Sequence, residues 1–259
     1  MIENHHTAKD AFGRLLDIMD ELRDKCPWDK KQTIESLRHL TIEETYELAD
    51  AILDNDMSGI RKELGDILLH IVFYAKIASE TADFTITDVI NGICEKLIYR
   101  HPHVFGDVSV KDAEDVKTNW ENLKIREGNK SILAGVPKSL PAIVKAHRIQ
   151  DKARAVGFDW DEREQVWDKI EEELDELKFE IGQMNVEKME AEFGDFLFSM
   201  VNAARLYGID PEAALERTNK KFIQRFNYLE EHTIKAGRPL TSMTLDEMNV
   251  IWEEAKKNT

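Results

Sequence analysis

Residues 42–53 read IEETYELADAIL and residues 63–75 read ELGDILLHIVFYA. Apolar side chains recur in both stretches with the period of an amphipathic helix. We expect one helix over about 34–53, a turn in the polar residues 54–59, and a second helix from residue 60 onward. Each helix contributes two acids, which are Glu44 and Glu47 on the first and Glu63 and Asp66 on the second.

The same four acids recur as Glu173, Glu176, Glu192 and Asp195, each 129 positions after its partner. A fixed offset near half the chain length is the signature of tandem duplication. A second helix pair is expected there, with its first helix at about 166–181. The chain is therefore predicted to be all-α, with two tandem helical-bundle repeats at 1–125 and 142–259. The linker is placed at 126–141, which is rich in glycine and proline.

Composition narrows the classes of function. The 259 residues are 42% hydrophobic, which suits a packed core, and no apolar run is long enough to span a membrane. No signal peptide is expected, because the first ten residues are polar. Cys26 and Cys94 have no close partner, which favours a reducing cytoplasm. A net charge of −16 argues against nucleic acid as a partner and requires a cation to mediate any anionic ligand.

The acidic quartets predict metal sites. Residues at i and i+3 share a helix face, so the two acids of one helix can point at those of the other. Converging carboxylates must protonate or recruit a cation, and oxygen ligands favour Mg²⁺, with Mn²⁺ as the alternative. A di-iron centre would need Glu-x-x-His motifs, whereas the corresponding positions of both quartets hold Glu and Asp. His70 follows Asp66 by one turn, but its twin is Ser199, which favours a packing or surface role over a metal ligand.

Basic and aromatic residues accompany both quartets. Lys96 and Arg100 form an i, i+4 pair that recurs as Lys221 and Arg225, and the two pairs suit an oligophosphate. Trp120 and Lys124 recur as Trp252 and Lys256. Each tryptophan is expected either to stack on a base or to fill the core. The basic pairs have their own alternative, which is an ordinary solvated helix face.

Local signals complete the expected architecture. Asp210-Pro211 predicts a helix start, and Thr244 with Glu247 predicts a capping box before the last helix. Residues 101–107 are expected to form a loop. Gly65 and Gly194 stand in mid-helix, where glycine costs about 1 kcal/mol, so they suggest close approach of two helices beside the metal. Simple tolerance of the two glycines is the alternative.

Together these motifs resemble the MazG family of nucleoside triphosphate pyrophosphohydrolases in its tandem two-domain form. The resemblance rests on residues 26–29, 43–66 and 101–107 in the first half, and on residues 157–160, 172–195 and 221–225 in the second. It implies an all-α fold, Mg²⁺ dependence and a homodimer. It also implies hydrolysis of nucleoside triphosphates to monophosphate and pyrophosphate, with broad base tolerance and a role in nucleotide-pool housekeeping.

The same resemblance implies a set of nucleotide contacts, which are Lys188, Lys221, Arg225, Trp252 and Lys256. The attacking group is expected to be a metal-bound water, with Glu172 as a candidate to position it. The second quartet is the favoured active copy, because Gly59 stands in the first half where Lys188 stands in the second. Three alternatives remain, which are equal competence of both copies, a nucleotide-sensing protein without turnover, and purely structural acidic bundles.

Overall fold

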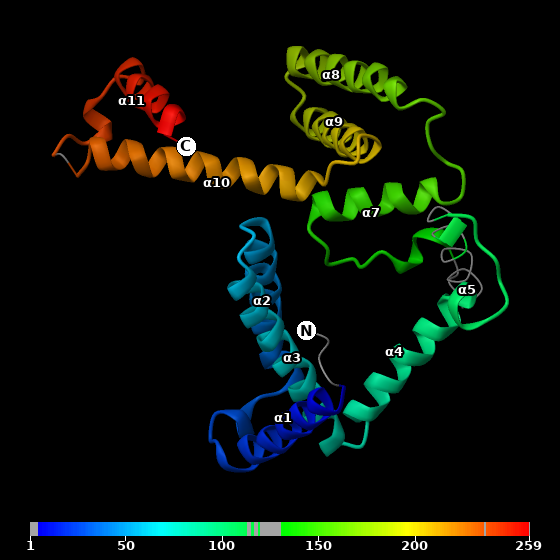
Figure 1. The fold of residues 1–259 in the computed structure, drawn as a ribbon. Helices are drawn as coiled ribbons and strands as arrows, with labels where there is room; N and C mark the ends of the chain where they lie inside the picture. Colours follow the sequence, from blue (N-terminus) through cyan, green and yellow to red (C-terminus); the bar gives the residue numbers. More distant parts are fainter. Residues whose placement is uncertain (1–4, 113–114, 117–118, 120–130, 236, 259) are drawn as a thin grey trace. The chain divides into compact units, whose positions relative to one another are not determined.

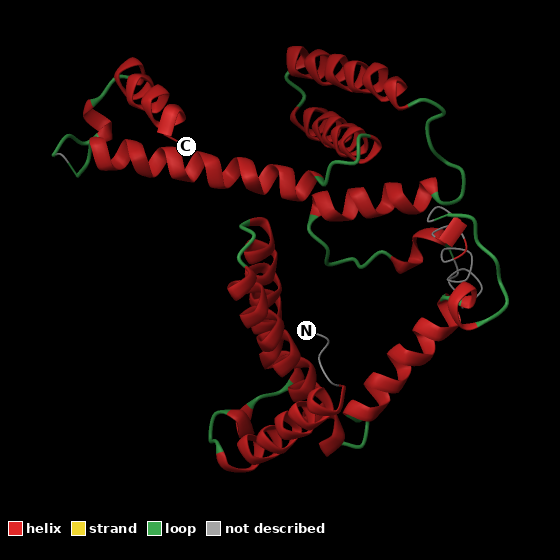
Figure 2. Ribbon diagram, viewed as in Figure 1, coloured by secondary structure: helices red, strands yellow, loops and turns green. Residues whose placement is uncertain are grey.

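The computed structural model describes residues 5–112, 115–116, 119, 131–235 and 237–258, which form helices joined by short loops (Figures 1 and 2). No strand occurs in this described part of the chain, so the all-α prediction is confirmed. The chain falls into two compact units, residues 1–110 and residues 111–259. The domain boundaries expected from the sequence stay a prediction. None of the described helices combines the length and apolar character needed to cross a bilayer.

The first unit is built around a helical hairpin. Its elements are α1 (His5–Lys25), a 3₁₀ turn η1 (Asp29–Lys31), α2 (Ile34–Leu53), α3 (Met57–Glu80), α4 (Ile86–Arg100) and α5 (Pro102–Phe105). Helices α2 and α3 pack along each other, and α1 packs on α3. The core between them contains Met19, Leu37, Val72 and Phe73. This core holds the two acid-bearing helices in register.

Capping side chains set the ends of the α2–α3 hairpin. Thr33 caps α2, because its hydroxyl accepts from the Ser36 amide while the Ser36 hydroxyl accepts from the Thr33 amide. Asp56 caps α3 by accepting from the Ser58 amide at 3.0 Å. The turn is therefore only residues 54–56, shorter than the predicted 54–59, because the aspartate satisfies the first helical amides directly.

The second unit repeats the hairpin. Its elements are a 3₁₀ turn η2 (Ile132–Gly135), α7 (Ala142–Arg154), η3 (Arg163–Gln165), α8 (Val166–Gln183), α9 (Val186–Leu206), α10 (Pro211–His232), η4 (Leu240–Ser242) and α11 (Leu245–Asn258). Helices α8 and α9 pack along each other, α7 packs on α9, and α10 pairs with α11. The predicted caps are confirmed, since Asp210 accepts from the Ala213 amide and Thr244 and Glu247 exchange hydrogen bonds.

Two local predictions were wrong. Residues 102–105 form the one-turn helix α5 within the expected loop 101–107, because Pro102 fits the first helical position without needing an amide donor. The glycines Gly65 and Gly194 mark no close helix approach, since a Cβ at either position would meet no atom within 4 Å. The crowded glycine of the hairpin is Gly59, where a Cβ would lie 3.1 Å from the Ala51 Cβ and 2.6 Å from Asp56 Oδ2.

These environments predict that an alanine at position 59 affects stability differently from an alanine at position 65 or 194. Gly65→Ala and Gly194→Ala gain helix propensity without a clash, so each should raise the free energy of unfolding by up to about 1 kcal/mol. Gly59→Ala should gain less or destabilise, because the new methyl group displaces the capping Asp56 side chain. Urea unfolding of the metal-free proteins would measure all three, and equal stabilisation by Gly59→Ala would contradict the tight contact.

Candidate functional site

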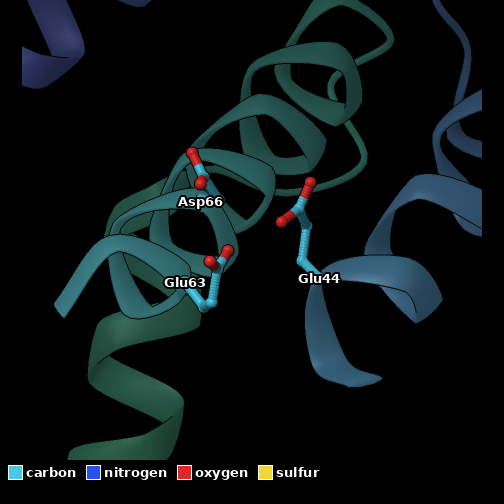
Figure 3. A group of neighbouring side chains, drawn as sticks. All are labelled: Glu44, Glu63 and Asp66. Atoms are coloured by element: carbon cyan, nitrogen blue, oxygen red, sulfur yellow. The ribbon is translucent and has the colours of Figure 1, made fainter. Parts of the chain in front are cut away.

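The first quartet converges across the α2–α3 hairpin. Glu44 on α2 points toward Glu63 and Asp66 on α3 (Figure 3), and one carboxylate oxygen of each lies within 4.8 Å of the other two. Glu63 is only 6% exposed, and its Oε2 atom is buried without a hydrogen-bond partner. We call Glu44, Glu63 and Asp66 the first cluster. Glu47, the fourth predicted ligand, lies on the exposed side of α2 outside this trio.

The second quartet converges across the α8–α9 hairpin in a similar way. Glu173 and Glu176 on α8 and Glu192 on α9 each place one oxygen within 4.8 Å of the other two, and they form the second cluster. Glu173 is buried at 6% exposure, as Glu63 is in the first cluster. Asp195, the fourth predicted ligand, lies outside this trio but lines a cleft together with Glu173.

Crowding of the carboxylates changes their acidity. The pKa of Glu44 is raised by burial first and then by the charges of Asp66, Glu47 and Glu63. The pKa of Glu192 is also raised by burial, and then by its acidic neighbours Glu176, Asp195, Glu173 and Glu180. Both clusters therefore resist the fully ionised state in the absence of a cation. This is the behaviour expected of a cation site built from carboxylates.

The donor set fits a hard divalent ion. Every member of the two clusters offers carboxylate oxygen, which Mg²⁺ and Mn²⁺ prefer, and Glu63 Oε2 is an orphaned buried acceptor that a cation would satisfy. No histidine joins either cluster among the described residues, as a di-iron centre of the Glu-x-x-His type requires. His70 is instead buried in α3 at 7% exposure, in agreement with the packing role rather than the surface role.

A lysine lies against each cluster, and neither was predicted from the sequence. Lys62 Nζ lies 3.0 Å from Glu63 Oε1, and Lys169 Nζ lies 2.8 Å from Glu173 Oε1. Lys169 also contacts Glu172, the predicted water-positioning residue, at 3.0 Å, so Glu172 lies on the exposed edge of the second cluster. The i, i+4 spacing of Lys169 and Glu173 is a signal that sequence inspection could have used.

Lys188, a predicted nucleotide contact, lies in the first turn of α9. Its Nζ atom is 3.4 Å from Oε1 of Glu180, a glutamate of α8 that is only 8% exposed. Glu180 also contributes to the raised pKa of Glu192. Lys188 is therefore held at the turn end of the α8–α9 hairpin, on the same side as the second cluster. Sequence reasoning missed Glu180 because no acid stands at the twin position, Ala51.

The other predicted nucleotide contacts lie on different helices. Lys221 and Arg225 are on α10, and Trp252 and Lys256 are on α11. Within the described second unit, α10 and α11 pair with each other and neither packs along α8. The Trp252 ring lies 5.1 Å from the Phe222 ring, and Lys256 Nζ lies 2.5 Å from Glu253 Oε1. The structure thus gives Trp252 a packing contact, and it does not bring α11 onto the helix that bears Glu173.

The counterparts in the first unit are only partly described. Lys96 and Arg100 lie on α4, and Lys96 is exposed. Trp120 and Lys124 fall outside the described residues, so their predicted roles stay predictions. The basic pair of this unit therefore stands on a helix that follows the acid-bearing hairpin, as the pair of the second unit does.

The cleft beside the second cluster has a volume of about 650 Å³. Its wall combines Glu173 and Asp195 with apolar and aromatic residues, among them Phe158, Trp160 and Phe198. Arg205, which is buried, donates hydrogen bonds to both carboxylate oxygens of Asp159 and so anchors the loop that carries Phe158 and Trp160. Burial is the largest single influence on Asp159 and acts to raise its pKa, but the hydrogen bonds from Arg205 and the Trp160 amide, together with the charges of Arg205 and Arg154, lower the pKa overall. The volume is in the range of small-molecule sites.

Comparisons with known proteins point to one family. The family model described as the MazG nucleotide pyrophosphohydrolase domain matches residues 32–105 and again residues 162–229, and each match contains one quartet. A nucleoside triphosphate pyrophosphohydrolase of Escherichia coli is 42% identical over 255 residues, which is 95% of this chain and 97% of that protein. A nucleoside triphosphate pyrophosphohydrolase/pyrophosphatase MazG of Thermotoga maritima is 45% identical over 250 residues, 95% of each chain. A crystal structure of a mazG-related protein from Thermotoga maritima covers 44% of this chain and 98% of its own, at 29% identity and a TM-score of 0.39.

The raised pKa of Glu192 predicts how stability depends on pH. A carboxyl group whose pKa lies above its usual 4.5 in the folded state costs stability as it ionises, so the metal-free chain should lose stability as pH rises from about 4.5 through the raised pKa. Glu192→Gln removes this cost. In EDTA at pH 7 the variant should melt at a higher temperature than the wild type, and the difference should vanish toward pH 4.

In excess Mg²⁺ the wild type should instead melt at the higher temperature, because it keeps the Glu192 carboxylate that binds the ion and that Glu192→Gln lacks. Circular dichroism melts at several pH values would measure both effects. Glu172→Gln, at the exposed edge of the cluster, is the matched control. A Glu192→Gln variant with the same pH profile as the wild type would show that the second cluster is not electrostatically strained.

Proposed function

Since the chain belongs to the MazG family of nucleotide pyrophosphohydrolases, we propose that it hydrolyses nucleoside triphosphates to nucleoside monophosphates and pyrophosphate. The reaction uses Mg²⁺, with Mn²⁺ as a substitute, and tolerates different bases, as suits a protein that clears nucleotide pools. The observation that carries this proposal is the second cluster, whose member Glu173 lines, together with Asp195, a cleft large enough for a small molecule. A cation there would join an acidic protein to an acidic substrate.

The proposed roles follow the chemistry of the side chains. Glu173, Glu176, Glu192 and Asp195 hold the divalent ion. When bound, Mg²⁺ offsets phosphate charge and lowers the pKa of a coordinated water. Glu172, at the exposed edge of the cluster, would orient the attacking water by accepting a hydrogen bond from it. Lys169 contacts Glu172 and Glu173 and holds both carboxylates in place for these roles.

The positive side chains complete the proposed phosphate site. Lys188, Lys221, Arg225 and Lys256 bind phosphate oxygens and stabilise the charge that spreads over them during transfer. Trp252 contacts the base. Because α10 and α11 do not pack along α8, the approach of these residues to the cluster requires either a shift within the unit or a second copy of the chain. The second copy is the simpler proposal, since the family resemblance implies a homodimer.

The exposed apolar surface supports a homodimer. Leu64, Leu68 and Ile71 on α3 are 39–52% exposed, and Phe193, Leu197 and Met200 on α9 are 40–53% exposed. Contiguous apolar faces of this kind mark protein interaction surfaces. Cys26 and Cys94 are free thiols, which agrees with the proposed cytoplasmic location. We expect no nucleic acid or membrane partner.

We assign turnover to the second quartet, and variants of its acids test this assignment. Glu176→Gln and Asp195→Asn should each lower kcat by roughly 100-fold or more, because each removes a charge that holds the ion at the reacting phosphate. The matched variants in the first unit, Glu47→Gln and Asp66→Asn, should keep most of the activity. Product analysis should identify monophosphate and pyrophosphate from each of several nucleoside triphosphates.

Loss of half the activity in Glu47→Gln would instead assign equal competence to the two units. Mg²⁺-dependent nucleotide binding without any turnover would support the nucleotide-sensing alternative and overturn the proposed reaction. Turnover that is unchanged by Asp195→Asn would show that the second quartet is not the site of hydrolysis.

The phosphate role of α10 has a separate test. Lys221→Ala should raise KM roughly tenfold, since a charge-assisted hydrogen bond to phosphate is lost. Mn²⁺ binding without nucleotide should stay unchanged, because Lys221 is not a metal ligand. Lys235→Ala, an exposed lysine of the α10–η4 connection that pairs with Glu231 at 3.1 Å, is the control. An unchanged KM in Lys221→Ala would favour the solvated-face interpretation of the basic pair.

A further inference from the structure

The first cluster already contains a cation that belongs to the protein. Lys62 Nζ lies 3.0 Å from Glu63 Oε1 and 3.8 Å from both Glu47 Oε2 and Asp66 Oδ2. Glu47 is on α2, whereas Glu63 and Asp66 are on α3, so one ammonium group bridges the two helices. Three of the four acids of the first quartet are therefore compensated by a single side chain.

Among the described residues, the second cluster has no equivalent lysine that bridges its two helices. The residue before Glu192, at the position equivalent to Lys62, is Ala191. The lysine of the second unit, Lys169, approaches from a different place, since its twin position is Leu40. Lys169 contacts only one member of the second quartet, Glu173, and that residue is on its own helix. Two acidic quartets with the same spacing thus have different internal counter-charges.

The orphaned oxygen of the first cluster shows that Lys62 leaves the site incomplete. Glu63 Oε1 accepts from Lys62, but the buried Oε2 atom of the same carboxylate has no partner. Lys62 is itself 66% exposed, so its side chain can leave for solvent without unpacking the core. The first cluster therefore still suits a cation, provided that the ammonium group moves away.

We propose that Lys62 is a built-in competitor for the cation position of the first cluster, so that this cluster binds divalent ions more weakly than the second. The inference rests on the proposed metal role of the two quartets. A divalent ion near an ammonium group about 4 Å away is repelled by roughly 2 kcal/mol even in bulk water, which corresponds to a factor on the order of tenfold or more in affinity. At rising metal concentration the second cluster fills first, and the first fills only after Lys62 is displaced.

Binding of Mn²⁺ to the full-length chain without nucleotide tests this order. Free Mn²⁺ is followed by its electron paramagnetic resonance signal during a titration. The wild type should show a tighter and a weaker class of site, and Glu63→Gln should remove the weaker class. Lys62→Ala should tighten that class on the order of tenfold. The reciprocal variant Ala191→Lys should weaken the tighter class by a similar factor.

Two control variants separate charge from other effects. Lys62→Arg keeps the positive charge and should leave the weaker class weak. Lys76→Ala removes another lysine of α3, which pairs with Asp20 at 2.7 Å outside the cluster, and should change neither class. A melting curve in EDTA gives a second readout: Lys62→Ala should lower Tm, because the acids lose their internal counter-charge, and Mn²⁺ should restore it.

The outcomes are distinct. If Lys62→Ala leaves the weaker class unchanged, or if Lys62→Arg tightens it as much as Lys62→Ala does, Lys62 does not compete with the metal and this inference is wrong. If Glu63→Gln removes no Mn²⁺ site at all, the first quartet is not a metal site and this inference is wrong, whereas the metal role of the second quartet in the proposed function is untouched by that result. The proposed competition is supported if Lys62→Ala tightens the weaker class of Mn²⁺ site, Lys62→Arg does not, and Ala191→Lys weakens the tighter class.

Discussion

Repulsion between carboxylates that face each other across a helical hairpin is the constraint on which both units depend. The i, i+3 spacing places two acids on one face of each helix, and the packing of α2 on α3 and of α8 on α9 brings those faces together. Apolar contacts elsewhere along each hairpin must hold the helices against this repulsion. The core around Val72 and Phe73, and that around Val166 and Ile170, provide those contacts. The facing carboxylates of each hairpin therefore need a positive charge nearby to offset their repulsion.

The two units place that charge differently, and the difference begins at the turn of each hairpin. In the first unit Ala51 and Gly59 lie close together, so that a Cβ at residue 59 would be 3.1 Å from the Ala51 Cβ. The equivalent positions in the second unit hold the ion pair of Glu180 and Lys188. The second hairpin thus has an ion pair where the first has two small residues, and a lysine of the predicted nucleotide set stands beside the second cluster. Duplication preserved the acids, while the divergence lies in what surrounds them.

Sequence reasoning predicted the features that local rules decide. The bounds of α2 and the start of α10 follow from periodicity and from capping residues such as Asp210, all of which act within a few positions along the chain. The contacts of Lys62 could not be predicted with equal ease, because they depend on which way a flexible side chain turns across the hairpin. Gly65 was misread for the same reason, since only the packed neighbours decide whether a mid-helix glycine is crowded.

The predicted basic pairs illustrate a further limit. Lys221 follows Lys96 by 125 positions, four fewer than the offset of the quartets. The structure accounts for the difference, because α3 has 24 residues where α9 has 21, and the connection at 81–85 is one residue longer than that at 207–210. Three residues turn a helix by roughly 300°, so α4 leaves its hairpin in a different direction from α10. A motif repeated in sequence therefore does not guarantee a site repeated in space.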